Sequence, residues 1–285
     1  MRKVCILRKI IVLCLLCLAG SLPLKAQYSD LATHEILLDS LFKHLRVADN
    51  DARRIRLNDS VQLILQTMLD APDAFSYPFE RLDYLGKVYS EDRRLRFYTW
   101  CFATDSALTF HCIIQRATGT WQQWYTEHPY VPDTARLLRD SEWYGALYYR
   151  AIPMRYNKGK TVYVLLGWGR ASMDSVTQYK VIDVLHEDDN GEMVLGLPVF
   201  DNGDKYFQHR CVFEYDAQSA FSVEYDGRKR IYADHLSPGR IDAEGRILSY
   251  GADMSVDVYQ HRGRRWILRQ DVKAKGQKNK PQSKL

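Results

Sequence analysis

An acidic residue next to a histidine, Asp234-His235, is one place in this sequence where acid–base chemistry could be carried out. It lies at the end of an expected strand and precedes Ser237-Pro238-Gly239, so an aspartate could orient a histidine base close to a serine. Neighbouring residues of a strand point to opposite faces, however, which would separate the two side chains. A turn ahead of Pro238 accounts for the same residues. We keep Asp234 and His235 as catalytic candidates and favour the turn.

Aromatic residues are concentrated between residues 121 and 149, and they include Trp121, Trp124, Tyr125, Trp143, Tyr144, Tyr148 and Tyr149. Exposed tryptophan and tyrosine rings stack on sugars or on peptide side chains, which makes Trp121, Trp124 and Trp143 candidate ligand-binding residues. The alternative, which we favour, is that these rings lie in the core, because buried aromatic residues supply much of its apolar area.

The motifs of several large enzyme classes are absent from the sequence. It has no GxSxG nucleophile elbow, no HExxH, no GxxxxGK[ST] phosphate loop and no GxGxxG. The acidic run 187–192 superficially resembles a calcium loop, but placing Gly191 at the sixth loop position puts His186 where a carboxylate is needed. Asn190-Gly191 is instead typical of a hairpin turn. We expect neither a metal ion nor a cofactor.

Three cysteines, Cys101, Cys112 and Cys211, remain after residue 26. If a two-residue loop joins the expected strands 95–103 and 107–116, Cys101 lies opposite Cys112 and a disulfide is geometrically possible. The favoured alternative is three buried thiols that act as small apolar side chains, because a register slip of one residue destroys the pairing.

The first 26 residues have the order of a secretory signal peptide: basic residues up to Lys9, an apolar run over 10–19, and the end Leu24-Lys25-Ala26. We expect cleavage after Ala26 and export to the periplasm or to the periplasmic face of the outer membrane. An uncleaved anchor is the alternative, although the apolar run is short for a membrane span.

Charge is distributed unevenly along the chain. Removing residues 1–26 takes five of the 40 basic residues and leaves 35 basic and 35 acidic ones. The end, 273–285, is basic and without apolar periodicity, so we expect a disordered tail. It could contact an anionic membrane surface electrostatically, but a solvated terminus is the simpler and favoured explanation. Nucleic acid is not an expected partner of an exported protein.

Two helices are expected at the start of the mature chain. Leu31, Leu38, Leu41, Phe42 and Leu45 form one apolar stripe, and Ile55, Val61, Leu65, Met68 and Leu69 form another. The segment 49–51 supplies capping side chains, and Pro72 lies just beyond the expected end of the second helix. The pattern predicts a helical hairpin over 27–74.

After the expected helices, the sequence pattern changes to runs of aromatic and β-branched residues that alternate with a period of two. Turns rich in Gly, Asp and Asn separate these runs. The expected strands are 95–103, 107–116, 145–155, 161–168, 178–185, 193–200, 206–215, 221–225, 230–234, 256–261 and 265–271. Short strands joined by short turns predict an antiparallel meander over 75–272, folded as a sandwich or an incomplete barrel. The expected fold class is α+β, mainly β.

Several blocks of sequence resemble a family of uncharacterised exported proteins of the bacterial cell envelope: Gly145-Ala-Leu-Tyr-Tyr149, Tyr163-Val-Leu-Leu-Gly-Trp168, Val181-Ile-Asp-Val-Leu185, Gly196-Leu-Pro-Val-Phe200, Phe213-Glu-Tyr215 and Asp234-His-Leu-Ser-Pro238. The resemblance covers roughly Gly86 to Asp257, and the order of the blocks is more specific than any single block. It implies an envelope location and a β-rich body, and it implies no activity, cofactor or site.

These observations lead us to expect a non-catalytic exported envelope protein with a binding or structural role, whose partner is an envelope protein or a glycan. The alternative is a glycan-binding module, or a hydrolase that acts on envelope carbohydrate. A glycan-processing site needs aromatic and carboxylate side chains that converge on a pocket, whereas a scaffold can bury its aromatic residues.

Overall fold

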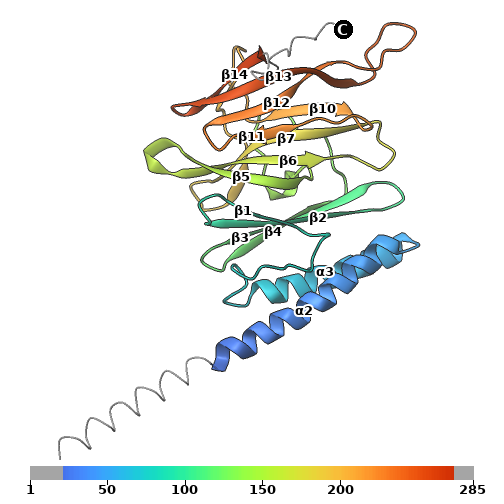
Figure 1. The fold of residues 1–285 in the computed structure, drawn as a ribbon, viewed down its shortest axis with the longest axis vertical. Coiled ribbons are helices and arrows are strands. Elements are labelled where there is room, and N and C mark those ends of the chain that lie inside the picture. The colour runs from blue at the N-terminus through green and yellow to red at the C-terminus, as the bar shows by residue number, and fades with distance from the viewer. Residues whose placement is uncertain (1–21, 273–285) are drawn as a thin grey trace, which may run out of the picture. The chain divides into compact units, whose positions relative to one another are not determined.

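The computed structural model describes residues 22–272 and has two N-terminal helices followed by mostly antiparallel sheets (Figure 1). The predicted α+β class with mainly β structure is confirmed, and the described strands form no closed barrel. Most of the predicted signal peptide, 1–26, and the whole of the predicted basic tail, 273–285, lie outside the described residues. The chain divides into two compact units: the first runs to Leu85 and includes residues 115–121, and the second holds the remainder.

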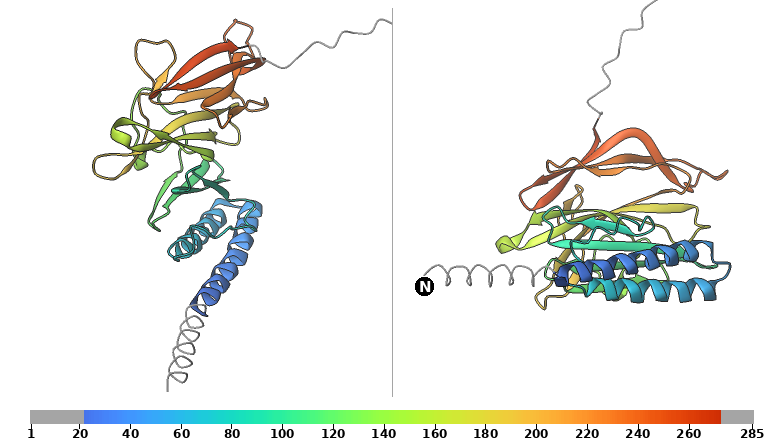
Figure 2. Two further views of the ribbon diagram at one scale, coloured as in Figure 1. Left: turned by 60° about the vertical axis from the view of Figure 1, so that its left-hand side comes forward. Right: turned by 60° about the horizontal axis from the view of Figure 1, so that its bottom comes forward.

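The first unit is built on two helices, α2 (Leu22–Val47) and α3 (Asp51–Leu69), which lie side by side (Figure 2). Asn50 caps α3, because its side chain accepts a hydrogen bond from the backbone N–H of Arg53. The buried faces carry most of the predicted stripes: Leu31, Leu38, Phe42, Leu45, Val61, Leu65, Met68 and Leu69. The prediction is wrong for Ile55, which is 48% exposed, because Asn58 takes the buried position one turn along α3.

A buried glutamate on α2 holds the segment that follows α3. The Glu35 carboxylate accepts hydrogen bonds of 2.7 Å from the Tyr77 hydroxyl and 2.7 Å from the backbone N–H of Arg81. Burial, together with the bond to Glu35, raises the pKa of Tyr77, so its hydroxyl remains a donor. These bonds fasten the connection between the helices and the first strand to the helical pair.

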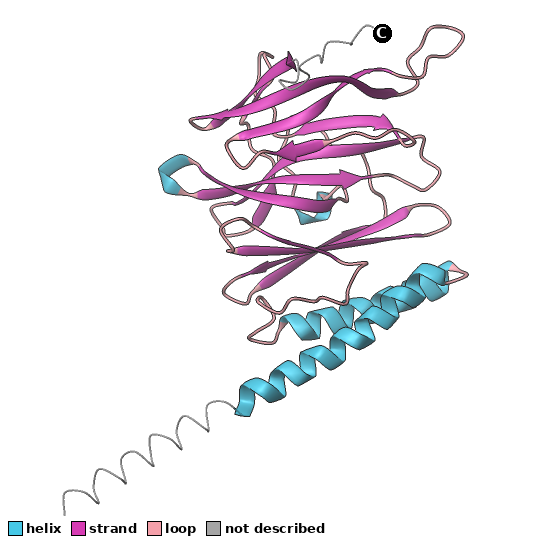
Figure 3. Ribbon diagram, in the orientation of Figure 1, coloured by secondary structure: helices cyan, strands magenta, loops and turns pink. Residues whose placement is uncertain are grey.

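The strands of the second unit form three sheets (Figure 3). Sheet 1 has the order β1 (Gly86–Tyr89), β2 (Leu95–Ala103), β3 (Leu108–Arg116), β4 (Trp121–Thr126). Residues 115–121, which hold the end of β3, the following turn and the first residue of β4, belong to the first unit. Sheet 2 has the order β10 (Cys211–Asp216), β7 (Thr177–Glu187), β6 (Thr161–Gly169), β5 (Leu147–Arg155), with β8 (Met193–Leu195) also paired to β7. Sheet 3 has the order β11 (Val223–Tyr225), β12 (Arg230–Pro238), β13 (Tyr250–Arg262), β14 (Arg265–Val272), β9 (Phe200–Asp201). The short β9 runs parallel to β14, whereas the pairs within sheet 2 and along β11 to β14 are antiparallel.

Sheet 2 is the middle layer and is apolar on both faces. Leu165 and Val181 point into one buried cluster with Phe97 of sheet 1. Their neighbours Leu166 and Ile182 point into a second cluster, which contains Trp266 of sheet 3 and other residues of that sheet. Because successive side chains of a strand alternate between faces, a layer covered on both sides needs a nearly continuous apolar run. The second unit is therefore a sandwich of three layers.

The observed strands differ from the predicted ones where the pattern is weak or the pairing is distant. The prediction missed β1, which has four residues, and β4, whose Gln122-Gln123 interrupts the apolar alternation. The expected strand 193–200 is divided into β8 and β9, and the pair β12–β13 continues well beyond its predicted ends. The hairpin turn at Asn190-Gly191 is confirmed, since Asp188 and Glu192 close it through a backbone hydrogen bond of 2.9 Å and Gly191 has a φ of 84°.

The three cysteines are free thiols in the structure. A disulfide between Cys101 and Cys112 is therefore not present, and the alternative of thiols packed as small apolar groups describes the arrangement. Cys112 lies in the cluster between sheets 1 and 2, and Cys101 packs against that cluster. Burial raises the pKa of Cys101 to about 11, so this thiol is neutral and a poor nucleophile. Within residues 22–272, no helix combines the length and the apolar character that a membrane crossing requires.

Candidate functional site

The histidine of the predicted acid–base pair has a different partner from its sequence neighbour. His235 Nδ1 lies 3.0 Å from Asp257 Oδ1, and the side chain of His235 is 29% exposed. Asp234 instead accepts a hydrogen bond of 2.7 Å from the backbone N–H of Ser222. The favoured turn ahead of Pro238 is wrong, because β12 continues to Pro238 with a β-bulge between Asp234 and Leu236 that shifts the register at His235.

The chemistry open to this pair is limited to orienting an imidazole. Asp257 fixes the ring, as the carboxylate does in acid–base pairs. Hydrogen bonds from the side chain and the backbone N–H of Ser255 lower the pKa of Asp253, a carboxylate of the neighbouring strand β13. Ser237, the sequence candidate for a nucleophile, pairs with Gly251 along the strands. We therefore do not place a serine hydrolase site here.

The three candidate tryptophans do not form an exposed platform. Trp124 is 4% and Trp143 is 1% exposed, and their ring centroids lie 6.4 Å apart. The Trp143 indole N–H donates to the hydroxyl of Tyr148 over 3.0 Å. Trp121 belongs to the first unit, where its indole N–H donates to Asp70 over 2.9 Å. For Trp124 and Trp143 the favoured alternative of a core position is confirmed, because these rings fill the space between sheets 1 and 2.

A buried ion pair in sheet 2 was missed by the sequence analysis. Arg210 Nε lies 2.8 Å from Asp183 Oδ2, and both side chains are 0% exposed. The Tyr144 hydroxyl and the backbone N–H of Val184 also donate to this carboxylate, over 3.1 and 2.7 Å. Burial raises the pKa of Asp183 and the charge of Arg210 opposes that effect. Three donors around one carboxylate are the bonding pattern of its ionised form.

This ion pair anchors the connection between β4 and β5. Arg210 donates to the backbone carbonyls of Asp133 and Arg136, the latter over 3.0 Å. The pair is inaccessible, so its role is structural. A signal for it did exist: Asp183 is a lone acid within the apolar run Val181-Ile-Asp-Val-Leu185, and such a residue needs a buried partner.

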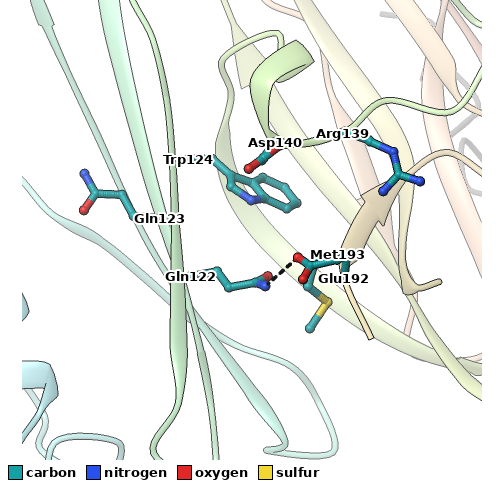
Figure 4. Close-up of a pocket in the computed structure, with 7 residues that line it drawn as sticks. All are labelled: Gln122, Gln123, Trp124, Arg139, Asp140, Glu192 and Met193. Carbon is teal, nitrogen blue, oxygen red and sulfur yellow. Dashed lines mark hydrogen bonds between the residues drawn. The ribbon is translucent and has the colours of Figure 1, made fainter. Parts of the chain in front are cut away.

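A pocket of about 390 Å³ lies beside β4 and is lined by Gln122, Gln123, Trp124, Arg139, Asp140, Glu192 and Met193. Figure 4 shows the Trp124 ring in the middle of the site, with Gln123 on the opposite side of the strand. Gln122 Nε2 donates to Glu192 Oε2 over a long 3.4 Å, and Arg139 donates to Asp188 over 3.1 Å. Side chains from three separate segments thus converge here, and Trp124 is the one sequence candidate among them.

An exposed apolar surface is the other notable feature of the second unit. The hairpin formed by residues 236–254, which we call the arm, extends beyond the strands of its sheet (Figure 3). Five large apolar side chains on it are between 41% and 97% exposed: Ile241, Ile247, Leu248, Tyr250 and Met254. Asp242 closes its tip, because its carboxylate accepts from the backbone N–H groups of Glu244 and Arg246.

The base of the arm is fastened to the end of β10. Asp216 Oδ2 lies 2.6 Å from Arg240 Nε and accepts a hydrogen bond of 2.9 Å from the Ser249 hydroxyl. Hydrogen bonds, first from the backbone N–H of Gln218 and then from Ser249, lower the pKa of Asp216. The carboxylate is therefore ionised at neutral pH and can hold Arg240.

Among residues 22–272, no group of three or more His, Cys, Asp or Glu side chains is arranged to hold a metal ion. The chain matches no protein-family model, no curated protein and no solved structure.

Proposed function

We propose that this chain is a non-catalytic exported protein of the bacterial cell envelope that binds a partner protein through the arm. The observation that carries the proposal is the cluster of exposed apolar side chains on residues 236–254. Exposed apolar side chains gathered on one hairpin are typical of interaction sites on proteins that are otherwise covered with polar groups. The expected signal peptide and the resemblance to envelope proteins support the location.

The arm cannot bury these side chains by itself. Ile241 and Ile247 face each other across the two strands, while Leu248 and Tyr250 lie on the other side of the ribbon by alternation. Within residues 22–272, the strand pairings of β11 reach Ala233, and those of β14 reach Val256, which is the partner of Val272. Two strands alone are at best marginally stable in water, so a partner that covers the ribbon stabilises it.

The charge of the arm favours a protein over a lipid surface. Residues 236–254 hold two arginines and three acidic residues, a net charge of −1. Arg240 is paired with Asp216, and Arg246 is paired with Asp242 and Glu244. Attraction to anionic lipid needs unneutralised basic residues, which the arm does not offer. The exposed apolar side chains fit an extended segment of another protein that would pack along the ribbon.

The test is recovery of a partner from native envelopes by the tagged mature chain and by variants of the arm. Ile247→Asp and Leu248→Asp place a charge on opposite faces of the ribbon and should each reduce recovery by about tenfold or more, as expected for a charge buried at an interface. Met173→Asp is the matched control, because Met173 is 58% exposed on a different loop. Recovery should persist at high salt and without residues 273–285.

Two outcomes would contradict the proposal. The first is equal recovery of the same partner by the parent chain and both arm variants. The second is a partner that is lost at high salt or on removal of residues 273–285, which would assign the interaction to the basic tail. Near-ultraviolet circular dichroism of each variant shows whether the aromatic core is intact.

A further inference from the structure

We propose that the pocket beside Trp124 binds a small sugar ring that presents hydroxyl or ammonium groups and carries no negative charge. This inference goes beyond the proposed function and does not depend on the arm, because the pocket is lined by β4, by the connection to β5 and by the β7–β8 hairpin. Its volume of about 390 Å³ suits a small ligand.

The lining offers mainly hydrogen-bond acceptors. Asp140 and Glu192 supply carboxylates, and Gln122 supplies an amide. The guanidinium of Arg139 is already neutralised by Asp188, so the local charge is negative. Acceptors in this arrangement select a ligand that is rich in donors, and the charge disfavours an anion. Neighbouring hydroxyl groups of a sugar ring, or one ammonium group, meet both requirements.

Gln122 is incompletely hydrogen-bonded. Its Oε1 is buried and accepts no hydrogen bond within the described part of the chain, and its Nε2 makes only the long bond to Glu192. A buried acceptor left without a donor is energetically unfavourable. A hydroxyl group both donates and accepts, so one entering between Gln122 and Glu192 can replace the weak bond with two better ones.

Trp124 supplies the apolar wall of the site. Figure 4 shows its indole nitrogen on the side of the ring turned toward Gln122 and Glu192. Because the side chain is only 4% exposed, a ligand would meet the edge of the indole and its N–H rather than its full face. Met193 borders the same space and adds a second apolar contact.

The segments that form the pocket are held together independently of any ligand. Leu138 and Leu195 exchange two backbone hydrogen bonds, of 2.8 and 2.9 Å; Leu138 precedes the lining residue Arg139, and Leu195 lies in β8 with Met193. The ion pair between Arg139 and Asp188 adds a side-chain link between the same two segments. A site fixed in this way loses little freedom when a ligand binds.

The experiment is a titration of the full mature chain with glucosamine, glucose and glucuronic acid, followed by tryptophan fluorescence and by ligand-observed NMR. Glucosamine and glucose should bind with dissociation constants on the order of millimolar, and glucuronic acid about tenfold or more weakly. Gln122→Ala and Glu192→Gln should each weaken binding of glucosamine by about tenfold.

Asp189→Asn is the matched control, because Asp189 lies on the same hairpin as Glu192 and its side chain is 100% exposed. This variant should bind as the parent does. The proposal is overturned if none of the sugars binds at about 20 mM, a concentration above the expected dissociation constants. It is also overturned if Glu192→Gln binds glucosamine as tightly as Asp189→Asn, or if glucuronic acid binds best.

Discussion

Replacing Arg210 by methionine should destabilise the second unit by about 3–5 kcal/mol, because it leaves a carboxylate buried without its counter-ion. Arg210 and Asp183 are both fully buried, and the two atoms of the pair lie 2.8 Å apart. Methionine keeps the apolar stem of the arginine but removes its charge and its donors. The backbone carbonyls of Asp133 and Arg136 would lose their partner in the same step.

A variant at an exposed ion pair shows how much of the stability loss is due to burial of the charge. Arg150 and Glu91 form an ion pair of 2.6 Å with side chains that are 46% and 36% exposed. Exposed pairs contribute about 0–1 kcal/mol, so Arg150→Met should cost no more than that. Chemical denaturation followed by the fluorescence of buried tryptophans such as Trp143 would compare the two variants.

A double variant and a change of pH test the cause. Asp183→Leu combined with Arg210→Met removes both charges and should recover at least about 2 kcal/mol of the loss. In Arg210→Met, burial raises the pKa of Asp183 without the opposing charge of Arg210, so the folded state takes up a proton at a higher pH than the unfolded state does. The loss of stability should thus be largest at neutral pH and shrink as the pH falls. A cost of Arg210→Met below about 1 kcal/mol, or one that grows toward acid pH, would refute the argument.

Two further predictions concern the core. Burial lowers the pKa of His111 to about 4, whereas the unfolded ring titrates near 6.5, so stability should fall by up to about 3 kcal/mol as the pH drops from 6.5 to 4. His111→Phe should remove this part of the pH dependence and His128→Phe, at an exposed position, should not; identical slopes of unfolding free energy against pH would contradict the assignment. Gly169→Ala should cost about 1–3 kcal/mol, because a methyl group there would lie 2.3 Å from the Tyr179 hydroxyl and 2.7 Å from the carbonyl of Gly145. Gly251→Ala, whose nearest contact is 3.8 Å, should change the melting temperature little, and equal shifts for the two variants would argue against a steric cause.

The sequence was a good guide wherever structure depends on local periodicity. The stripe at three- and four-residue spacing predicted both helices, and alternation predicted β2 with the bounds that the structure shows, Leu95–Ala103. Turn chemistry predicted the hairpin at Asn190-Gly191. Each of these features is set by a few consecutive residues, so the chain reveals them without knowledge of the fold.

The candidate sites were harder to predict, because their members come from distant segments. His235 contacts Asp257, which lies 22 residues further along the chain on the neighbouring strand. A bulge shifts the register of the two strands at this point, and the sequence does not reveal it. Asp183 looked like an isolated acid until the order of sheet 2 placed Arg210 beside it. The pocket joins Trp124 to Glu192 through the β7–β8 hairpin, and no local pattern encodes that contact.

By itself, then, the sequence determined which segments form helices and strands, where tight turns fall and which motifs are absent, because those properties follow from backbone preferences and from the spacing of apolar residues. The tertiary structure decided that Trp124 and Trp143 are buried, that the ribbon over 236–254 is exposed, and which acid each base meets. Burial and pairing depend on how sheets stack and on strand register, and a shift of one residue reverses the face to which every side chain of a strand points.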